Sequence, residues 1–134
     1  MFLVYHPEGS DEPTRWRYDP RKLMSAEREM LERRTGRDFT DFTKGVQSGN
    51  SLCRRALLFM FLKRDHPGVK WEDVDFAWDE LRLEHSRQEL ELIREQVVKN
   101  LTGDQLAAAL EQLDAEIAEA PEDEEGKARL PIAD

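Results

Sequence analysis

The sequence lacks most of the residue patterns that identify an enzyme. It contains a single cysteine, Cys53, which excludes an internal disulfide and is typical of a reducing compartment. Its seven glycines are scattered, and none forms a GxGxxG or GxxxxGK phosphate-binding loop. The three histidines, His6, His66 and His85, lie in different segments without a cysteine pair nearby, so no shared metal site is predicted.

Long apolar runs are also missing. The longest, Ala56 to Leu62, is far shorter than the roughly 20 residues that span a bilayer. At the start of the chain, Pro7 interrupts the apolar residues 1–5 before a signal-peptide core could form. We therefore expect a soluble protein without membrane contact.

Charge is abundant and mostly negative. The formal net charge is −9, charged residues make up 37% of the chain, and the mean hydropathy is −0.75. Such a composition is typical of long solvated helices with one apolar stripe each. The acidic balance argues against binding of nucleic acid, which needs neutralisation of phosphates, and favours basic protein partners.

The first twenty residues predict a β-hairpin. Phe2 to Tyr5 is rich in strand formers, and Thr14 to Tyr18 alternates polar and apolar residues. The segment between them, residues 7–13, is dense in turn residues. Trp16 and Tyr18 are expected to share one face and to pack onto helices.

Two helices are predicted next. Asp19 and Pro20 have the residue types of a helix cap and first turn, so we expect a helix from there to Arg34, closed by Gly36. A short helix should follow over Phe39 to Val46. The inward positions are expected to be Leu23, Ala26, Met30, Leu31, Phe39, Phe42 and Val46.

The strongest apolar signal follows. Leu52 to Asp65 predicts a central helix, because residues 57–62 are apolar on all sides and together supply on the order of 10 kcal/mol of gross burial free energy. After a break at residues 66–68, we expect another helix over Trp71 to Leu83. Its inward candidates are Val74, Phe76, Trp78 and Leu81.

Beyond Glu84 the aromatic residues disappear and the apolar residues thin into two stripes. The stripes predict two helices joined by a tight turn, in which Thr102 caps the second helix or Gly103 ends the first. Residues 118–134 are acidic and are expected to be disordered. The predicted fold is mainly α: a helical core domain with a short N-terminal β-hairpin (1–84), a C-terminal helical hairpin (85–119) and an acidic tail (120–134).

The two C-terminal stripes are the candidate interaction site. They pack against each other, or they offer an apolar face to a partner helix or to another copy of the chain. The candidate partner-binding residues are Leu90, Ile93, Val97, Leu106, Leu110, Leu113 and Ile117.

Other possible sites have simpler structural explanations. Cys53 is expected to be a small buried residue, although the first turn of a helix could lower the pKa of a thiol there. The acidic residues between Glu72 and Glu80 lack the EF-hand spacing and are expected to be structural. Basic residues alternate with Trp16 and Tyr18, but nearby acidic residues oppose a nucleic-acid patch. No catalytic residue, metal or cofactor is predicted, and we expect no enzyme activity.

The region from Trp16 to about Glu84 resembles the tail assembly chaperones of long-tailed bacteriophages, particularly those of actinobacterial hosts. The resemblance lies in the order and spacing of motifs over about half of the chain, and the region after Glu84 does not share it. The motifs are Tyr18-Asp19, Leu23-Met24, Glu27, Glu32, Thr35-Gly36, Phe39, Phe42, the apolar segment Ala56 to Leu62, the sequence from Lys63 to Pro67, and the sequence from Trp71 to Phe76.

The resemblance implies a protein that binds the tape measure protein, keeps its apolar helices soluble and helps the tail tube protein to polymerise around it. It implies a homo-oligomer acting in the cytoplasm of the bacterial host, without a cofactor, and absent from the mature virion. One alternative is a structural neck or head–tail connector component of the phage. A second is a DNA-binding regulator, since Phe39 to Val46 followed by the helix from Leu52 could form a helix-turn-helix.

Overall fold

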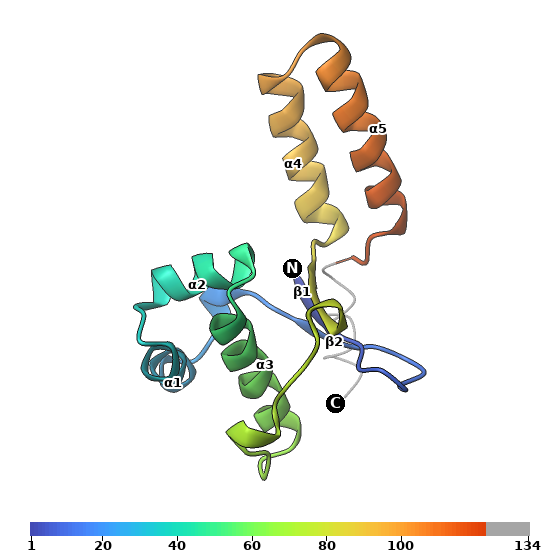
Figure 1. The fold of residues 1–134 in the computed structure, drawn as a ribbon. Coiled ribbons are helices and arrows are strands. Elements are labelled where there is room, and N and C mark those ends of the chain that lie inside the picture. The colour runs from blue at the N-terminus through green and yellow to red at the C-terminus, as the bar shows by residue number, and fades with distance from the viewer. Residues whose placement is uncertain (123–134) are drawn as a thin grey trace, which may run out of the picture. The chain divides into compact units, whose positions relative to one another are not determined.

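The computed structural model describes residues 1–122 and is dominated by helices, with one small antiparallel sheet (Figure 1). The expectation of a mainly α fold with strands at the N-terminus is therefore confirmed. Most of the predicted acidic tail, residues 123–134, lies outside the described part of the chain. None of the helices in residues 1–122 is both long enough and apolar enough to cross a membrane.

The sheet has three strands in the order β2-β1-β3. Strand β1 covers Phe2–Tyr5, β2 covers Thr14–Arg17 and β3 covers Leu81–Glu84. The first two are the predicted hairpin, whereas β3 was not predicted. Trp16 stacks on Phe61 with ring centroids 5.5 Å apart, so the hairpin does pack onto a helix as expected.

The helix predicted to start at Pro20 is wrong in its first turn. A single 3-10 turn spans Pro20–Lys22, and helix α1 covers only Ser25–Thr35. Leu23 lies between them in extended conformation and is buried, because the chain must turn there to bring that side chain into the core. Of the predicted inward residues on α1, Leu31 is fully buried, but Ala26 is exposed.

Helices α2 (Phe39–Ser48) and α3 (Ser51–Asp65) form as predicted. The Asn50 side chain caps α3 by accepting a hydrogen bond from the Cys53 N–H at 3.0 Å. Residues 57–61 of α3 are all buried, so this helix is the centre of the core. Helices α1 and α2 both pack against it.

The helix predicted over Trp71 to Leu83 is wrong. The chain forms 3-10 turns at Trp71–Asp73 and Trp78–Glu80 and then enters β3. Arg55 on α3 explains part of the difference, because it donates to the carbonyl oxygens of Trp71 (3.0 Å) and Val74 (2.6 Å), which a helix would use itself. The carbonyl of Glu80 accepts from the His6 N–H instead, at 2.8 Å.

The chain divides into two compact units, which we name by their content. The core unit is Leu3–Arg82. The hairpin unit consists of Met1–Phe2 and the described chain from Leu83 onward, and it contains helices α4 (Arg87–Asn100) and α5 (Gly103–Glu119). Within it, α4 and α5 run side by side in opposite directions (Figure 1).

Candidate functional site

The predicted partner-binding residues lie along the seam between α4 and α5. Only Leu90 is buried, with 4% of its surface exposed, while Ile93 is 37% exposed. No residue of α5 is buried, so two single helices cover each other only in part. The structure thus brings the two stripes together without enclosing them. The half-buried members are Val97, Leu106, Leu110, Leu113 and Ile117.

Polar contacts close the seam at one end. The Arg87 guanidinium donates to the carbonyl oxygens of Ile117 (3.2 Å) and Ala120 (3.3 Å) and pairs with the Glu122 carboxylate at 2.6 Å. The Arg87 N–H donates to the Pro121 carbonyl at 2.8 Å. A cation placed on the free carbonyls at the end of α5 also complements the helix dipole. One residue therefore joins the start of α4 to the end of α5.

The other end of the hairpin is a tight turn. Gly103 adopts the left-handed conformation with φ +65, and the Thr102 side chain makes no capping hydrogen bond. Halfway along the hairpin, Arg94 pairs with Asp114 at 2.8 Å. The hairpin is therefore held by its turn, one mid-seam ion pair and the Arg87 contacts, with a thin apolar seam between.

The outer side of α4 carries an apolar edge that the stripe pattern missed. Leu92 is 62% exposed and Val98 is 47% exposed, although both are large apolar side chains. Neither residue belongs to the stripe that repeats every three or four residues along the seam. Apolar residues outside such a stripe indicate an exposed apolar surface, and this was the signal in the sequence that could have identified the edge. A shallow hollow of about 330 Å³ joins this edge to the seam, because Leu92 and the seam residues Ile93 and Val97 all line it. Its lining is Leu92, Ile93, Gln96, Val97, Asn100 and Leu101.

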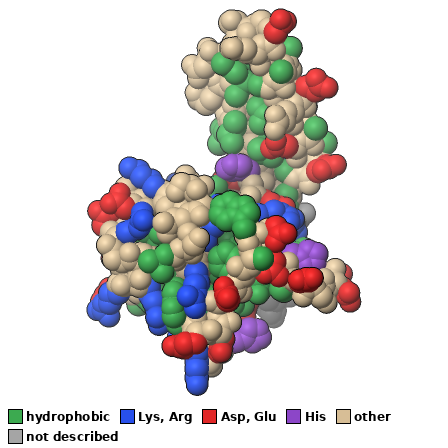
Figure 2. Space-filling view, in the orientation of Figure 1, with side chains coloured by type: hydrophobic (Ala, Val, Ile, Leu, Met, Phe, Trp, Pro, Cys, Tyr) green, Lys and Arg blue, Asp and Glu red, His purple; other side chains and the backbone are tan. Residues whose placement is uncertain are grey.

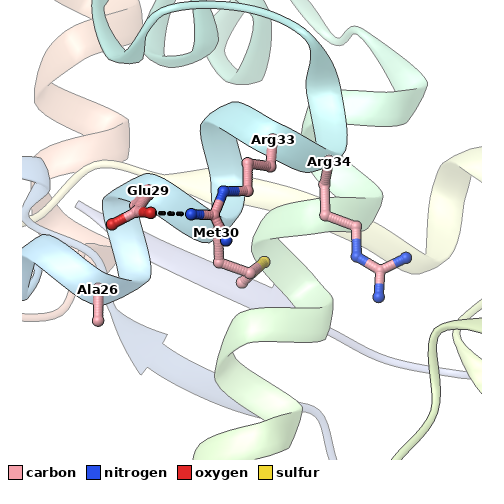
Figure 3. A pocket seen from close by; sticks show the side chains of 5 residues that line it. All are labelled: Ala26, Glu29, Met30, Arg33 and Arg34. Atoms are coloured by element: carbon pink, nitrogen blue, oxygen red, sulfur yellow. Dashed lines mark hydrogen bonds and ion pairs between the residues drawn. The ribbon is translucent and has the colours of Figure 1, made fainter.

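A second hollow, of about 580 Å³, lies on α1 of the core unit (Figure 3). Met30 and Ala26 supply its apolar surface. Arg33 is paired with Glu29 one turn earlier, whereas Arg34 extends away from that pair. The Arg34 guanidinium lies 4.6 Å from the Trp71 ring centroid and has no carboxylate partner among residues 1–122. This hollow therefore combines an apolar surface from Ala26 and Met30 with the Glu29–Arg33 ion pair and one cation, Arg34, that no carboxylate in the described part of the chain neutralises.

The charges of the chain are unevenly distributed along the sequence. Residues 14–70 contain 14 Lys and Arg but only 7 Asp and Glu, a net charge of +7. Residues 83–122 contain 3 basic and 10 acidic residues, a net charge of −7. On the face shown in Figure 2, Lys and Arg gather over α1 to α3, and the charged side chains seen over α4 and α5 are acidic. The acidic residues on either side of this basic region balance it, because the core unit as a whole (residues 3–82) contains 15 basic and 15 acidic residues.

Two arginines of α3 bear on the DNA-binding alternative. Arg54 Nε donates to the Val46 carbonyl at 2.9 Å, and its guanidinium lies 5.3 Å from the Trp78 ring centroid. Arg55 donates to the two loop carbonyls described above. Both guanidinium groups are thus engaged inside the core unit, whereas a recognition helix offers free donors to base edges.

Buried titratable groups in the core unit have structural explanations. Cys53 is fully buried, and burial raises the pKa of its thiol, so it is the small core residue that was expected. Burial also raises the pKa of Tyr18 to about 12, a rise that the nearby Thr43 hydroxyl partly offsets. The Tyr18 hydroxyl nevertheless has no hydrogen-bond partner. No group of three or more His, Cys, Asp or Glu side chains within residues 1–122 is arranged to hold a metal ion.

Comparisons with protein-family models, with curated proteins and with solved structures gave no match.

Proposed function

We propose that this chain is a tail assembly chaperone of a long-tailed bacteriophage and that its hairpin unit binds apolar helices of the tape measure protein. The observation that carries the proposal is the incompletely covered seam of α4 and α5. Ile93 is exposed, and the facing residues of α5 are only half-buried. An amphipathic helix laid along the hairpin would cover these side chains and become soluble itself.

The surrounding charge suits this role. The hairpin region carries a net charge of −7, so a complex with an apolar client would remain well solvated. The proposed protein acts in the host cytoplasm without a cofactor or catalytic residue, assists assembly of the tail tube protein and is absent from the mature virion. The motifs between Trp16 and Glu84 support this assignment by their resemblance to such chaperones.

Co-expression with the tape measure protein of the same genome tests the proposal. We expect a soluble complex where the client alone is insoluble, with its stoichiometry given by light scattering. Ile93→Glu and the pair Leu110→Glu with Leu113→Glu should each abolish capture. Gln112→Glu is the matched control, because it adds the same charge at an exposed position of α5.

Two results would count against the proposal. A soluble, folded chain that does not retain the client excludes the chaperone function. Detection of the chain in purified virions by mass spectrometry favours the neck or connector component instead, since a chaperone leaves the particle.

A further inference from the structure

We propose that the protein associates with itself head to tail, with the α4 edge of one copy lying in the α1 hollow of a second copy. The α4 edge is defined as Leu92 with its acidic neighbours Glu91 and Glu95. The α1 hollow is the one lined by Ala26, Glu29, Met30, Arg33 and Arg34. The α4 edge adjoins the surface proposed for the client, because Leu92 lines one hollow with Ile93 and Val97.

The apolar parts of the two surfaces are complementary, because one is an exposed leucine and the other is a hollow with apolar surface. Leu92 projects from α4 with 62% of its surface exposed, more than any other Leu, Ile or Val in the described chain. The α1 hollow is about 580 Å³, large enough to receive a leucine and its neighbours on the helix, and Met30 lines it. Rows of side chains four residues apart form the ridges and grooves by which helices pack. The row Leu92, Gln96, Asn100 on α4 and the row Ala26, Met30, Arg34 on α1 have this spacing.

The carboxylates of the α4 edge and the Arg34 guanidinium of the α1 hollow have charges of opposite sign. Glu91 and Glu95 are exposed, lie one helical turn apart on the same side of α4, and have no cationic partner within residues 1–122. Arg34 at the rim of the hollow has no carboxylate partner there either. Its guanidinium is held against Trp71, so it is ordered before any partner arrives. Burying Leu92 in the hollow would place the carboxylates of Glu91 and Glu95 near the Arg34 guanidinium, so that each group gains a partner of opposite charge.

A second copy of the chain is the occupant that the charges favour. Each copy carries the carboxylates of Glu91 and Glu95 on its α4 edge and the Arg34 guanidinium at the rim of its α1 hollow, so every copy carries both halves of the interaction. Because the two surfaces differ, the contact is heterologous: it leaves one free α4 edge and one free α1 hollow on a pair, and it closes into a ring or continues as a chain.

Sedimentation and light scattering of the full chain measure the association. In about 50 mM NaCl we expect the mass to rise above that of the 15.7 kDa monomer as concentration increases, and to fall towards it in about 500 mM NaCl, where charges are screened within a few ångströms. A monomer under all conditions overturns the proposal. So does a monomer that only becomes more compact at low salt, because the attraction would then act within one chain.

Charge-reversal variants locate the contact. Arg34→Glu should weaken association at least tenfold, and so should the pair Glu91→Arg with Glu95→Arg. Mixing these two proteins should restore it, because each reversed surface then meets its complement and the unchanged surfaces still match. A mixture that stays monomeric while both variants are folded by circular dichroism overturns the assignment.

A variant at an exposed site tests the contact without the risk that misfolding causes the loss of association. Leu92→Asp replaces a side chain that the monomer hardly buries, so the fold should persist while association is lost. Lys44→Glu is the matched control: it is exposed and basic on α2 but outside the hollow, and it should associate like the unmodified chain. Equal loss for Lys44→Glu and Arg34→Glu would show general charge attraction without this contact. Client capture that survives Leu92→Asp, with self-association lost, would separate this surface from the one proposed for the client.

Discussion

Arg87, the first residue of α4, donates a hydrogen bond from its guanidinium to the carbonyl oxygen of Ile117 in the last turn of α5, at 3.2 Å. This contact and its neighbours hold together the end of the hairpin opposite to its turn. We expect Arg87→Gln to destabilise the hairpin by about 1 kcal/mol, which is below the ~1.5–3 kcal/mol usual for bonds to a charged group because the side chain is about one-third exposed.

Amide hydrogen exchange measures this effect where it should occur. In Arg87→Gln the amides in the last turn of α5 should exchange faster than in the unmodified protein, while those of α3 should not change. Lys99→Gln is the control, because it removes a cation from the same helix without touching α5. Unaltered exchange at the end of α5 would show that the Arg87 contacts contribute nothing to its stability.

Gly49 gives a prediction about the core unit. It has φ +88, and a Cβ at this position would lie 2.6 Å from Cη2 of the Trp78 ring. Gly49→Ala should therefore combine backbone strain of about 1 kcal/mol with a cost of at most about 1 kcal/mol for displacing the Trp78 ring, which is 66% exposed and can shift. Urea unfolding gives the total, and a change in tryptophan fluorescence would report displacement of Trp78.

Gly36 separates the two contributions. It has φ +67, but no atom lies within 4 Å of the position that a Cβ would take there, so Gly36→Ala carries the strain without the clash. Gly49→Ala should be the more destabilising of the two, and the difference should shrink when Trp78→Ala is present in both proteins. Equal losses for the two alanine variants would mean that Trp78 moves aside freely.

The ion pair of Glu27 with Arg64 predicts a pH dependence. Both oxygens of the carboxylate accept from the guanidinium at 2.7 Å, which lowers the pKa of Glu27 below the usual 4.5. A lowered pKa in the folded state stabilises the protein above the unfolded value, and this stabilisation is lost as the pH falls through the folded value. Glu27→Gln should therefore cost about 0.5–1 kcal/mol at about pH 7, since the pair is partly exposed, and progressively less as the pH falls below 4.5.

Chemical unfolding at a series of pH values tests this pair. Glu29→Gln is the control, because Glu29 pairs with Arg33 inside the same exposed helix and should contribute little at any pH. A destabilisation by Glu27→Gln that is the same in acid as at neutral pH would instead assign the effect to packing.

The raised pKa of Tyr18 predicts how the stability of the folded protein changes at alkaline pH. Its pKa is raised from 10.0 to about 12 by burial, so the folded state holds the proton more tightly than the unfolded state does. Stability is thus complete below pH 10 and falls as the pH rises towards 12. Tyr18→Phe should remove that loss, and at neutral pH it should have no effect or stabilise slightly, because the hydroxyl has no hydrogen-bond partner. A clear destabilisation at neutral pH would contradict this account and indicate a bond to Thr43.

The correct parts of the sequence prediction depended on local signals. Helix α3 was predictable because residues 57–61 are apolar without interruption, and α4 and α5 because their stripes repeat every three or four residues. Gly49 and Asn50 mark the break between α2 and α3. Each of these signals is contained in the segment that folds.

The errors arose where distant residues decide the structure. Val74 and Leu81 are buried as expected, yet their segment is not helical. Arg55 donates hydrogen bonds to two carbonyl oxygens of this segment, and its last residues pair with β1 as strand β3. Trp78 was expected inside and is 66% exposed. For the candidate site, the stripes were found but Leu92 was missed, although its place outside the stripe was a signal; how much of it is exposed depends on how little of α4 the single neighbour α5 can cover.

The thin seam between α4 and α5 has a consequence for how the protein melts. With Leu90 as the only buried side chain on either helix, the hairpin loses little apolar contact when it opens, whereas opening α3 exposes the whole core. The two parts should therefore not share one cooperative transition. A calorimetric trace would then report two events of unequal enthalpy, and an occupant bound to the hairpin would raise the temperature of the first one alone.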